Sequence, residues 1–321
     1  MIRAFVHRDG RLEAADPAAP EAALWIDLVS PTEAEAGAVS AALGLPLPRQ
    51  AEMEEIEPSS RLYHGEAGPV MTALLPADAD ADAPVMAPAS FVLTPERLVT
   101  LRLNDPRPFR TYPGHAGQMP AGCAGPEAVM LGLLEEVIDR LADVLERLGR
   151  DVAALSASIF APPEAAPARA RDFRRLLSEI GRKGDMVSNM RDALLSLERL
   201  LGFLASVLAG RGAGRDLRGQ VKTLARDVSA LTEQGGFLAL KVNFLLDASL
   251  GMISVEQNAI IKIFSVAAVA FLPPTLIASI YGMNFEAMPE LTLRWGYPAA
   301  LAAMVLSAVA PLVYFRRRGW L

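Results

Sequence analysis

Residues Ile263 to Tyr281 read IFSVAAVAFLPPTLIASIY, a run of nineteen residues without a charge. As an α-helix this run would be about 28 Å long, which is close to the thickness of about 30 Å of a bilayer's hydrocarbon core. A second uncharged run covers Pro298 to Phe315. Aromatic residues lie at the ends of both runs, as is typical of membrane interfaces: Tyr281, Trp295, Tyr297, Tyr314 and Trp320. Two helices buried in a globular core are the alternative, but we expect transmembrane helices at 263–281 and 298–315.

Charges on either side of the two runs predict their orientation. The tail 316–321, RRRGWL, has three arginines directly after the second run, whereas the connection 282–297 has one arginine and two glutamates. Cytoplasmic flanks of membrane spans are enriched in Lys and Arg. We therefore expect a bacterial-type inner membrane protein with a cytoplasmic tail and a short external loop. Since two crossings return the chain to its starting side, the N-terminus is also expected in the cytoplasm.

Residues 1–125 alternate β-like runs with helical stretches and predict a cytoplasmic α/β domain. The β-like runs are ALWIDLV, VMTALL, SFVLT and RLVTLRL, and Ser30-Pro31-Thr32-Glu33 is a typical helix start. A Pro- and Gly-rich stretch, YPGHAGQMPAGCAGP, is expected to separate this domain from a helical region. That region should begin with an antiparallel helical hairpin over 126–212, interrupted by APPEAAPA.

A stalk helix is expected over 213–262, continuing into the first span. Its apolar residues follow the alternating steps of four and three that form a coiled-coil seam: Leu217, Val221, Leu224, Val228, Leu231, Gly235, Leu238, Val242 and Leu245. We expect copies of the chain to associate along this seam; the alternative is an amphipathic helix within the chain's own core. The fold class is thus an α+β membrane protein with an α/β domain, a hairpin, a stalk and two C-terminal transmembrane helices.

A small or weakly polar stripe follows the first span at helical spacing, namely Asn258, Ile261, Ser265, Ala268, Leu272, Thr275 and Ser279. Because two helices cannot enclose a polar path alone, several subunits would be needed to build one. The stripe is typical of a pore with a hydrophobic constriction. The alternative is that its Ser and Thr hydroxyls only bond their own helix backbone. Pro273 and Pro274 remove two backbone donors within the span and should bend it.

Several classes of function are disfavoured by the sequence. The net charge of −6 and the absence of a basic patch outside the tail argue against a nucleic-acid partner. His7, His64 and His115 show no zinc-ligand spacing, and Cys123 is alone. GRGAGRD lacks the end of a phosphate-binding loop, and nothing indicates an enzyme. Acidic residues along the first hairpin helix, Glu135, Glu136, Asp139, Asp143 and Glu146, are expected to pair with Arg140, Arg147 and Arg150.

YGMNFEAMPEL, from Tyr281 to Leu291, resembles the Gly-Met-Asn motif that marks the CorA family of magnesium transporters. FLPPTLIASIY before it, WGYP after it and the terminal WL extend the resemblance, and the predicted order of elements agrees along nearly the entire chain. The resemblance implies a homopentameric funnel in which Gly282, Met283 and Asn284 form a selectivity filter. Asn284 would hold the water shell of Mg²⁺ through its amide oxygen, since Mg²⁺ loses water reluctantly. Glu286 and Glu290 would attract cations to the external loop, or are simply solvated.

The same resemblance implies gating by intracellular Mg²⁺ bound between subunits. Asp247 matches the position of a family sensor carboxylate, and Glu54 or Glu55, in EMEEIE, is expected to be its partner from the neighbouring subunit. A Glu in place of a second Asp departs from the family pattern, and a solvated helix face is the alternative interpretation of EMEEIE. We expect passive uptake of Mg²⁺ driven by the membrane potential. A Zn²⁺, Co²⁺ or Ni²⁺ transporter of the same superfamily, with proton coupling, and a non-conducting oligomeric scaffold in the bilayer are the alternatives.

Overall fold

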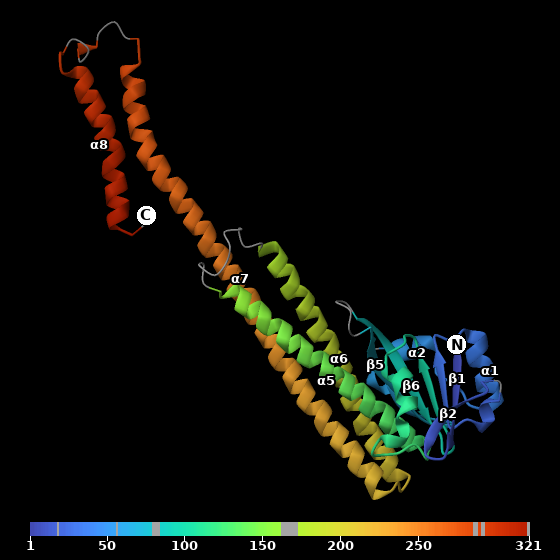
Figure 1. Ribbon diagram of the computed structural model, residues 1–321. Coiled ribbons are helices and arrows are strands. Elements are labelled where there is room, and N and C mark those ends of the chain that lie inside the picture. Colours follow the sequence, from blue (N-terminus) through green and yellow to red (C-terminus); the bar gives the residue numbers. More distant parts are fainter. Residues whose placement is uncertain are drawn as a thin grey trace. The chain divides into compact units, whose positions relative to one another are not determined.

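The computed structural model describes residues 1–17, 19–55, 57–78, 84–161, 173–284, 288–289 and 293–319 (Figure 1). Two compact units divide the chain, an N-terminal unit Met1–Leu246 and a C-terminal unit Asp247–Leu321. The long helix α7, Arg215–Tyr281, contributes its first part to the N-terminal unit and its last part to the C-terminal unit.

A seven-stranded sheet forms the centre of the N-terminal unit, in the order β2-β1-β3-β7-β6-β5-β4. Strands β3 and β7 pair in parallel and the other neighbours pair antiparallel. The strands are β1 (Ile2–Arg8), β2 (Arg11–Ala15), β3 (Trp25–Val29), β4 (Leu62–Gly65), β5 (Gly68–Ala77), β6 (Val85–Leu93) and β7 (Leu98–Arg102). The β-like runs of the sequence are thereby confirmed as β3, β5, β6 and β7.

Both faces of the sheet are covered because side chains alternate along each strand. On one face, Trp25, Phe91 and Leu98 belong to a core that also includes residues of the long helices. On the other face, Ile26 and Val99 pack against two short helices. These are α1 (Glu33–Leu43), which begins at the Thr32 capping box, and α2 (Gln50–Glu54). The remaining short helices are η1 (Pro20–Ala22), α3 (Pro58–Arg61), α4 (Pro108–Thr111), η2 (Tyr112–Gly114) and η3 (Ala116–Gln118).

A buried ion pair joins the two central strands. Arg102 of β7 donates from Nε and Nη2 to the two carboxylate oxygens of Asp27 of β3, at 2.9 and 2.8 Å, and both side chains are fully buried. Thr100 donates to the same carboxylate at 2.8 Å, and the guanidinium lies 4.6 Å from the ring centre of Phe109. A buried charge is tolerated when it is paired and hydrogen-bonded in this way. The pair was not anticipated from the sequence.

Helices α5 (Pro126–Ile159) and α6 (Phe173–Gly210) cover the first face of the sheet, and the first part of α7 contributes residues to the same core. Helix α6 contacts β5 through Ser196, whose Oγ accepts from the backbone N–H of Leu74 at 2.9 Å. The link expected at 112–126 is instead part of the core, since Tyr112, Ala116 and Cys123 are buried. The α/β domain and the hairpin, predicted as separate domains, thus lie within one compact unit. Sequence composition marked the change from strands to helices but not the shared core.

The predicted self-association along the α7 seam is wrong, because the seam is buried within its own chain. Val228 is fully buried, and Leu238 and Val242 are only 4% and 6% exposed. A Cβ added at Gly149 of α5 would lie 3.9 Å from Leu238, and one at Gly184 of α6 would lie 3.4 Å from Val242. The seam therefore packs against α5 and α6. The alternative interpretation is therefore correct: this part of α7 is an amphipathic helix that packs in the core of its own chain.

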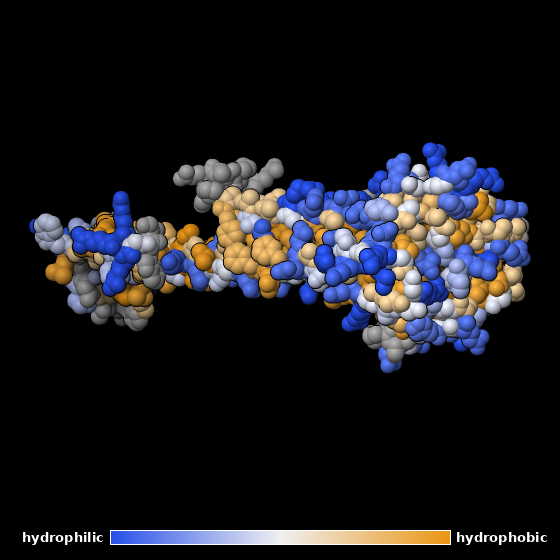
Figure 2. All heavy atoms as spheres, turned by 90° about the horizontal axis from the view of Figure 1, so that it is seen from below, coloured by the Kyte–Doolittle hydropathy of each residue, from blue (hydrophilic) through white to orange (hydrophobic). Residues whose placement is uncertain are grey.

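The C-terminal unit contains the last part of α7 and helix α8, Gly296–Arg317. Helices α6, α7 and α8 are long and apolar enough to cross a membrane. Within their most apolar windows, 44% of α6 is buried, against 11% of α7 and 6% of α8. Helix α6 uses its apolar face in the core, whereas α7 and α8 leave theirs exposed, as the two predicted spans should. In Figure 2, where hydrophobic residues are orange, apolar residues are visible on the surface of the C-terminal unit.

Candidate functional site

Helix α7 ends immediately before the Gly-Met-Asn motif. The N–H of Gly282 donates to the carbonyl oxygens of Ala278 and Ser279, at 2.9 and 3.2 Å, and a Cβ at this position would lie only 3.2 Å from the Ala278 oxygen. Met283 and Asn284 follow in an irregular, exposed conformation. The motif therefore presents the Asn284 amide directly beyond the helix terminus. Glu286 and Glu290 lie outside the described residues.

All seven residues of the proposed pore-lining stripe are exposed in the single chain: Asn258, Ile261, Ser265, Ala268, Leu272, Thr275 and Ser279. Ile261 and Leu272 are 60% and 65% exposed despite their apolar side chains. Nothing in the described part of this chain covers the stripe. Its residues are therefore available either to solvent in a pore or to other copies of the chain.

The α7 span also has a buried face, which carries small side chains. Val266 and Ala270 are 4% and 6% exposed, and Ala300 of α8 is 8% exposed, so the two helices of this unit pack through small side chains. At about 100° per residue, Val266 and Ala270 lie on the face nearly opposite to the stripe. The helix thus has one face against α8 and one facing away from it. Large apolar side chains such as Phe264 and Phe271, 72% and 71% exposed, lie between these faces and suit contact with lipid.

One hydroxyl of the stripe, that of Thr275, forms a hydrogen bond with the backbone of its own helix. Thr275 Oγ1 donates to the Leu272 carbonyl at 2.9 Å, which is the alternative considered for the hydroxyls of this span. Its oxygen still has acceptor capacity. Helix α7 continues through Pro273 and Pro274, which lack the N–H groups that would bond the carbonyls of Val269 and Ala270. Free carbonyl oxygens in a span are tolerated where water or a neighbouring helix meets them.

The proposed sensor carboxylates lie at element ends or on an exposed helix face. Glu54 is the last residue of α2 and Glu55 follows it, so EMEEIE is a helix end rather than a continuous helix face. Both are exposed, and Glu54 accepts a hydrogen bond of 2.8 Å from Gln50 Nε2. Glu52 is engaged differently, because it accepts from the Arg49 backbone at 3.1 Å, and this bond, with the Arg49 side chain, lowers its pKa.

Asp247 is exposed on α7 and begins the C-terminal unit. Among the residues that the structure describes, no three His, Cys, Asp or Glu side chains of one chain converge as a metal site. The proposed sensor joins Asp247 of one copy to Glu54 or Glu55 of another, and it remains a prediction.

Within the described residues, Glu135 and Glu136 of α5 have partners other than the expected arginines. Glu135 accepts from Gln220 Nε2 of α7 at 2.8 Å, and Glu136 accepts from Thr111 at 2.8 Å and contacts His115 Nε2 at 2.8 Å. Burial raises the pKa of Glu135, and the carboxylates of Asp139 and Asp227 raise it further against the opposing bond from Gln220. The expected local pairs are found for Asp143 with Arg140 and for Glu146 with Arg150, at 3.8 and 3.7 Å. Contacts between elements far apart in sequence account for the difference.

An exposed apolar stripe on α7 escaped the sequence analysis. Phe237, Leu240 and Phe244 are 65%, 71% and 58% exposed, and their spacing places them on one side of the helix, away from the buried seam. Phe160 stacks on Phe244 with ring centres 6.0 Å apart and is itself half exposed. The sequence does contain a signal for this stripe, because Phe237, Leu240 and Phe244 are spaced by three and four residues outside the seam. We call Phe237, Leu240 and Phe244 the outer stripe.

Comparisons with known proteins agree over the full length. Residues 20–317 match the family model described as CorA-like Mg²⁺ transporter protein. The chain is 38% identical to the magnesium transport protein CorA of Pasteurella multocida over 325 residues, and 37% identical to that of Haemophilus ducreyi over 324 residues, with 100% of each chain covered. It is also similar in fold to the complete structure of the CorA magnesium transporter from Methanocaldococcus jannaschii, with a TM-score of 0.79 and 18% identity over 100% of this chain and 99% of that one.

Proposed function

The chain belongs to the CorA-like Mg²⁺ transporter family and is a magnesium transporter, and from this premise we propose that it is one subunit of a homopentameric channel for passive Mg²⁺ uptake. The observation that carries the proposal is the division of the α7 span into two faces. One face packs against α8 through Val266 and Ala270, and the face turned away from α8 bears the exposed stripe that ends just before Asn284. Copies arranged around an axis would place this stripe along the ion path.

Asn284 suits the recognition of a hydrated cation. Mg²⁺ prefers oxygen ligands and keeps several of its waters, so a ring of neutral amide oxygens can accept hydrogen bonds from the water shell without removing it. A ring of carboxylates in the same place would hold the ion more tightly and slow its release. Gly282 supports this arrangement because its close approach to the Ala278 carbonyl lets the chain turn directly after the helix.

The membrane potential would drive the ion inward without a further energy source. A divalent cation gains about 4.6 kcal/mol for each 100 mV of potential that it crosses. The stripe below the motif is mostly apolar at Ile261, Ala268 and Leu272. A narrow apolar segment of this kind can close a pore by excluding water and open it with a small change in helix position.

Assembly of several copies is supported by exposed apolar surface. The outer stripe on α7 and many apolar side chains on both spans are exposed in the described part of the chain, although Phe160 stacks on Phe244. Such contiguous apolar surface marks contacts with other chains or with lipid. The number of five subunits comes from the family resemblance.

The proposed orientation places both termini in the cytoplasm and the loop 282–297 outside. Arg316 and Arg317 occupy the last turn of α8, and Arg318 lies 5.6 Å from the ring centre of Tyr314. These charges support the positive-inside assignment. They also complement the negative end of the α8 dipole, which is a second reason for their position.

Regulation by intracellular Mg²⁺ is proposed to use Asp247 of one subunit with Glu54 or Glu55 of its neighbour. The three side chains are exposed, which is what a site shared between copies needs. Mg²⁺ bound mainly through water would bridge such carboxylates. Bound Mg²⁺ would stabilise the closed state, and its loss at low cytoplasmic concentration would release the subunits.

Reconstitution into liposomes tests the transport function. We expect the purified protein to take up Mg²⁺ under an inside-negative potential without a pH gradient, and Asn284→Ala to abolish this uptake. Asn189→Ala, on α6 of the N-terminal unit, is the matched control and should transport normally. Each variant is assayed in parallel with Zn²⁺, Co²⁺ and Ni²⁺ and with an imposed pH gradient.

The outcomes separate the alternatives. Normal Mg²⁺ uptake by Asn284→Ala would remove the amide ring from the mechanism. Zn²⁺ uptake that depends on the pH gradient, with little Mg²⁺ uptake, would favour a proton-coupled zinc transporter. No flux of any cation from correctly inserted protein would support a scaffold.

A further inference from the structure

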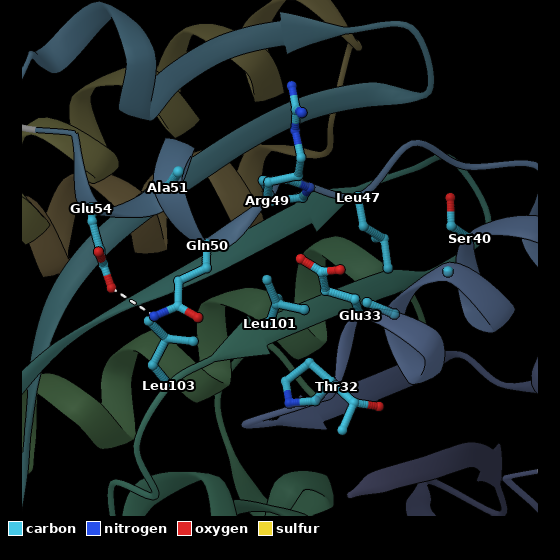
Figure 3. A pocket seen from close by; sticks show the side chains of 14 residues that line it. Thr32, Glu33, Ser40, Leu47, Arg49, Gln50, Ala51, Glu54, Leu101 and Leu103 are labelled. Carbon is cyan, nitrogen blue, oxygen red and sulfur yellow. Dashed lines mark hydrogen bonds between the residues drawn. The ribbon is translucent and has the colours of Figure 1, made fainter.

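A cavity of about 780 Å³ lies in the N-terminal unit between α1, the segment leading into α2, and strand β7 (Figure 3). Pockets that bind small molecules commonly have volumes of about 300–1,000 Å³. The cavity is on the sheet face that carries α1 and α2, whereas the long helices cover the opposite face. The proposed ion path makes no use of it.

The floor of the cavity is apolar. Leu47, Leu101 and Leu103 line it, and Ala36 and Ala51 contribute small side chains from the two helices. Figure 3 shows Leu101 and Leu103 between the side chains of α1 and those of α2. This surface suits the hydrocarbon part of a ligand, which gains about 0.8 kcal/mol for each CH₂ group buried.

Apart from the two Nη groups of Arg49, each side-chain donor group around the cavity already donates a hydrogen bond. Gln50 Nε2 donates to Glu54 at 2.8 Å, and Thr32 Oγ1 donates to Glu35 at 3.3 Å. Ser40 donates to the carbonyl oxygen of Leu45. Arg49 Nε donates to Glu52 at 2.9 Å, and Figure 3 shows the Arg49 side chain directed away from the cavity floor.

Acceptors, by contrast, remain open. Within the described residues, no hydrogen bond or ion pair engages the carboxylate of Glu33, the first residue of α1. Gln50 Oε1 also remains as an acceptor, since the amide nitrogen provides the bond to Glu54. Figure 3 shows Glu33 and Gln50 on two sides of Leu101. Two glutamates, Glu33 and Glu54, and one cation, Arg49, are on the wall, and the Arg49 side chain is directed away from the floor. The balance of charge therefore favours a ligand that donates hydrogen bonds and carries positive charge.

We propose that this cavity binds a small organic ammonium ion with a hydrocarbon body. The ammonium group donates to the Glu33 carboxylate and to Gln50 Oε1, and the hydrocarbon lies on Leu101 and Leu103. A hydrogen bond to an ionised partner is stronger than a neutral one, so the charge of Glu33 should dominate selectivity. Glu54 lies on the wall and adds negative charge, but it is not one of the two groups proposed to accept from the ammonium.

Ligand-observed NMR titration of the full-length protein in detergent tests the proposal. The probes share one hydrocarbon body and differ in charge: butylammonium, butan-1-ol and butanoate, with methylammonium to test the apolar floor. At neutral pH an alkylamine is protonated, as the lysine side chain is. We expect butylammonium to bind at least tenfold more tightly than each of the other three.

Two variants and one control locate the binding. Glu33→Gln should weaken butylammonium binding about tenfold or more, because it removes the charge of the open acceptor. Gly37→Leu adds hydrocarbon to the cavity wall at a helical position where a Cβ would meet no atom within 4 Å, so the fold should persist while the cavity is blocked. Glu13→Gln, on exposed strand β2 away from the cavity, should bind as the unmodified protein does.

Several results would overturn the proposal. One is the absence of saturable butylammonium binding; another is butanoate binding as tightly as butylammonium, which would assign the cavity to anions through helix N-termini. Unchanged affinity in both Glu33→Gln and Gly37→Leu would place the binding elsewhere.

Discussion

Leu238 and Leu240 lie two residues apart on helix α7 but face different surroundings. Leu238 is 4% exposed and packs in the core of the N-terminal unit, whereas Leu240 is 71% exposed on the outer stripe. We expect Leu238→Ala to destabilise the fold of each subunit and Leu240→Ala to weaken the assembly of subunits. Because both variants remove the same atoms, each serves as the other's control.

The magnitudes follow from burial. Truncating a buried leucine to alanine costs about 2–5 kcal/mol, through lost transfer free energy and the cavity left behind. For a unit of this size that corresponds to an apparent Tm lower by roughly 4–20 °C. Truncating Leu240 should change the free energy of subunit unfolding by about 0.5 kcal/mol or less. If the outer stripe is covered by a neighbouring copy, the variant should lose about 1–2 kcal/mol of association free energy for each subunit.

Thermal unfolding of the full-length protein in detergent, followed by circular dichroism, measures the first effect. Native mass spectrometry over a dilution series measures the second, as the concentration at which the oligomer dissociates. Equal losses of Tm in the two variants would refute the assignment of separate faces. If the Leu238→Ala oligomer dissociated more easily without any loss of Tm, copies of the chain would instead associate along the seam.

The remaining predictions concern the sensor and the acidic cluster. Asp247→Ala should leave the protein protease-sensitive in saturating Mg²⁺, while Asp216→Ala on the same helix keeps the protection seen in the unmodified protein; unchanged protection in Asp247→Ala would remove this carboxylate from the sensor. Because burial raises the pKa of Glu135, its ionised form costs stability above the raised pKa, and this cost disappears as the pH falls below the unfolded-state value. Glu135→Gln should therefore raise the midpoint of urea unfolding at neutral pH and have little effect in acid, whereas exposed Glu146→Gln should change neither; a lower midpoint at neutral pH would contradict this reasoning.

Predictions from the sequence were accurate where a local pattern decides the structure. The strands β3, β5, β6 and β7 and the start of α1 within Ser30 to Glu33 follow from side-chain alternation and helix-start signals, which act within a few residues. The two spans follow from uncharged length. The motif at Gly282 to Asn284 could be found because its residues are adjacent in the chain.

Other features depended on partners distant in the sequence. The pairing of Asp27 with Arg102 needs β3 and β7 to lie in register, and the contacts of Glu135 and Glu136 need α7 and the segment near Thr111 beside α5. The cavity above Leu101 forms only because α1 and α2 lie on the same face of the sheet. No spacing in the sequence indicates these neighbours.

Helix α7 illustrates both cases. Its sequence by itself determined that a long helix has an apolar seam and runs into a membrane span, since the period of the apolar residues and the length of the uncharged run are local properties. The seam's partner was decided only by the tertiary structure. An apolar seam has the same pattern whether it packs against its own chain or another, and here Gly149 of α5 and Gly184 of α6 let the chain's own helices approach it closely. With the seam buried, the outer stripe and the stripe from Asn258 to Ser279 remain exposed, so they are the surfaces that stay available to other copies or to an ion path.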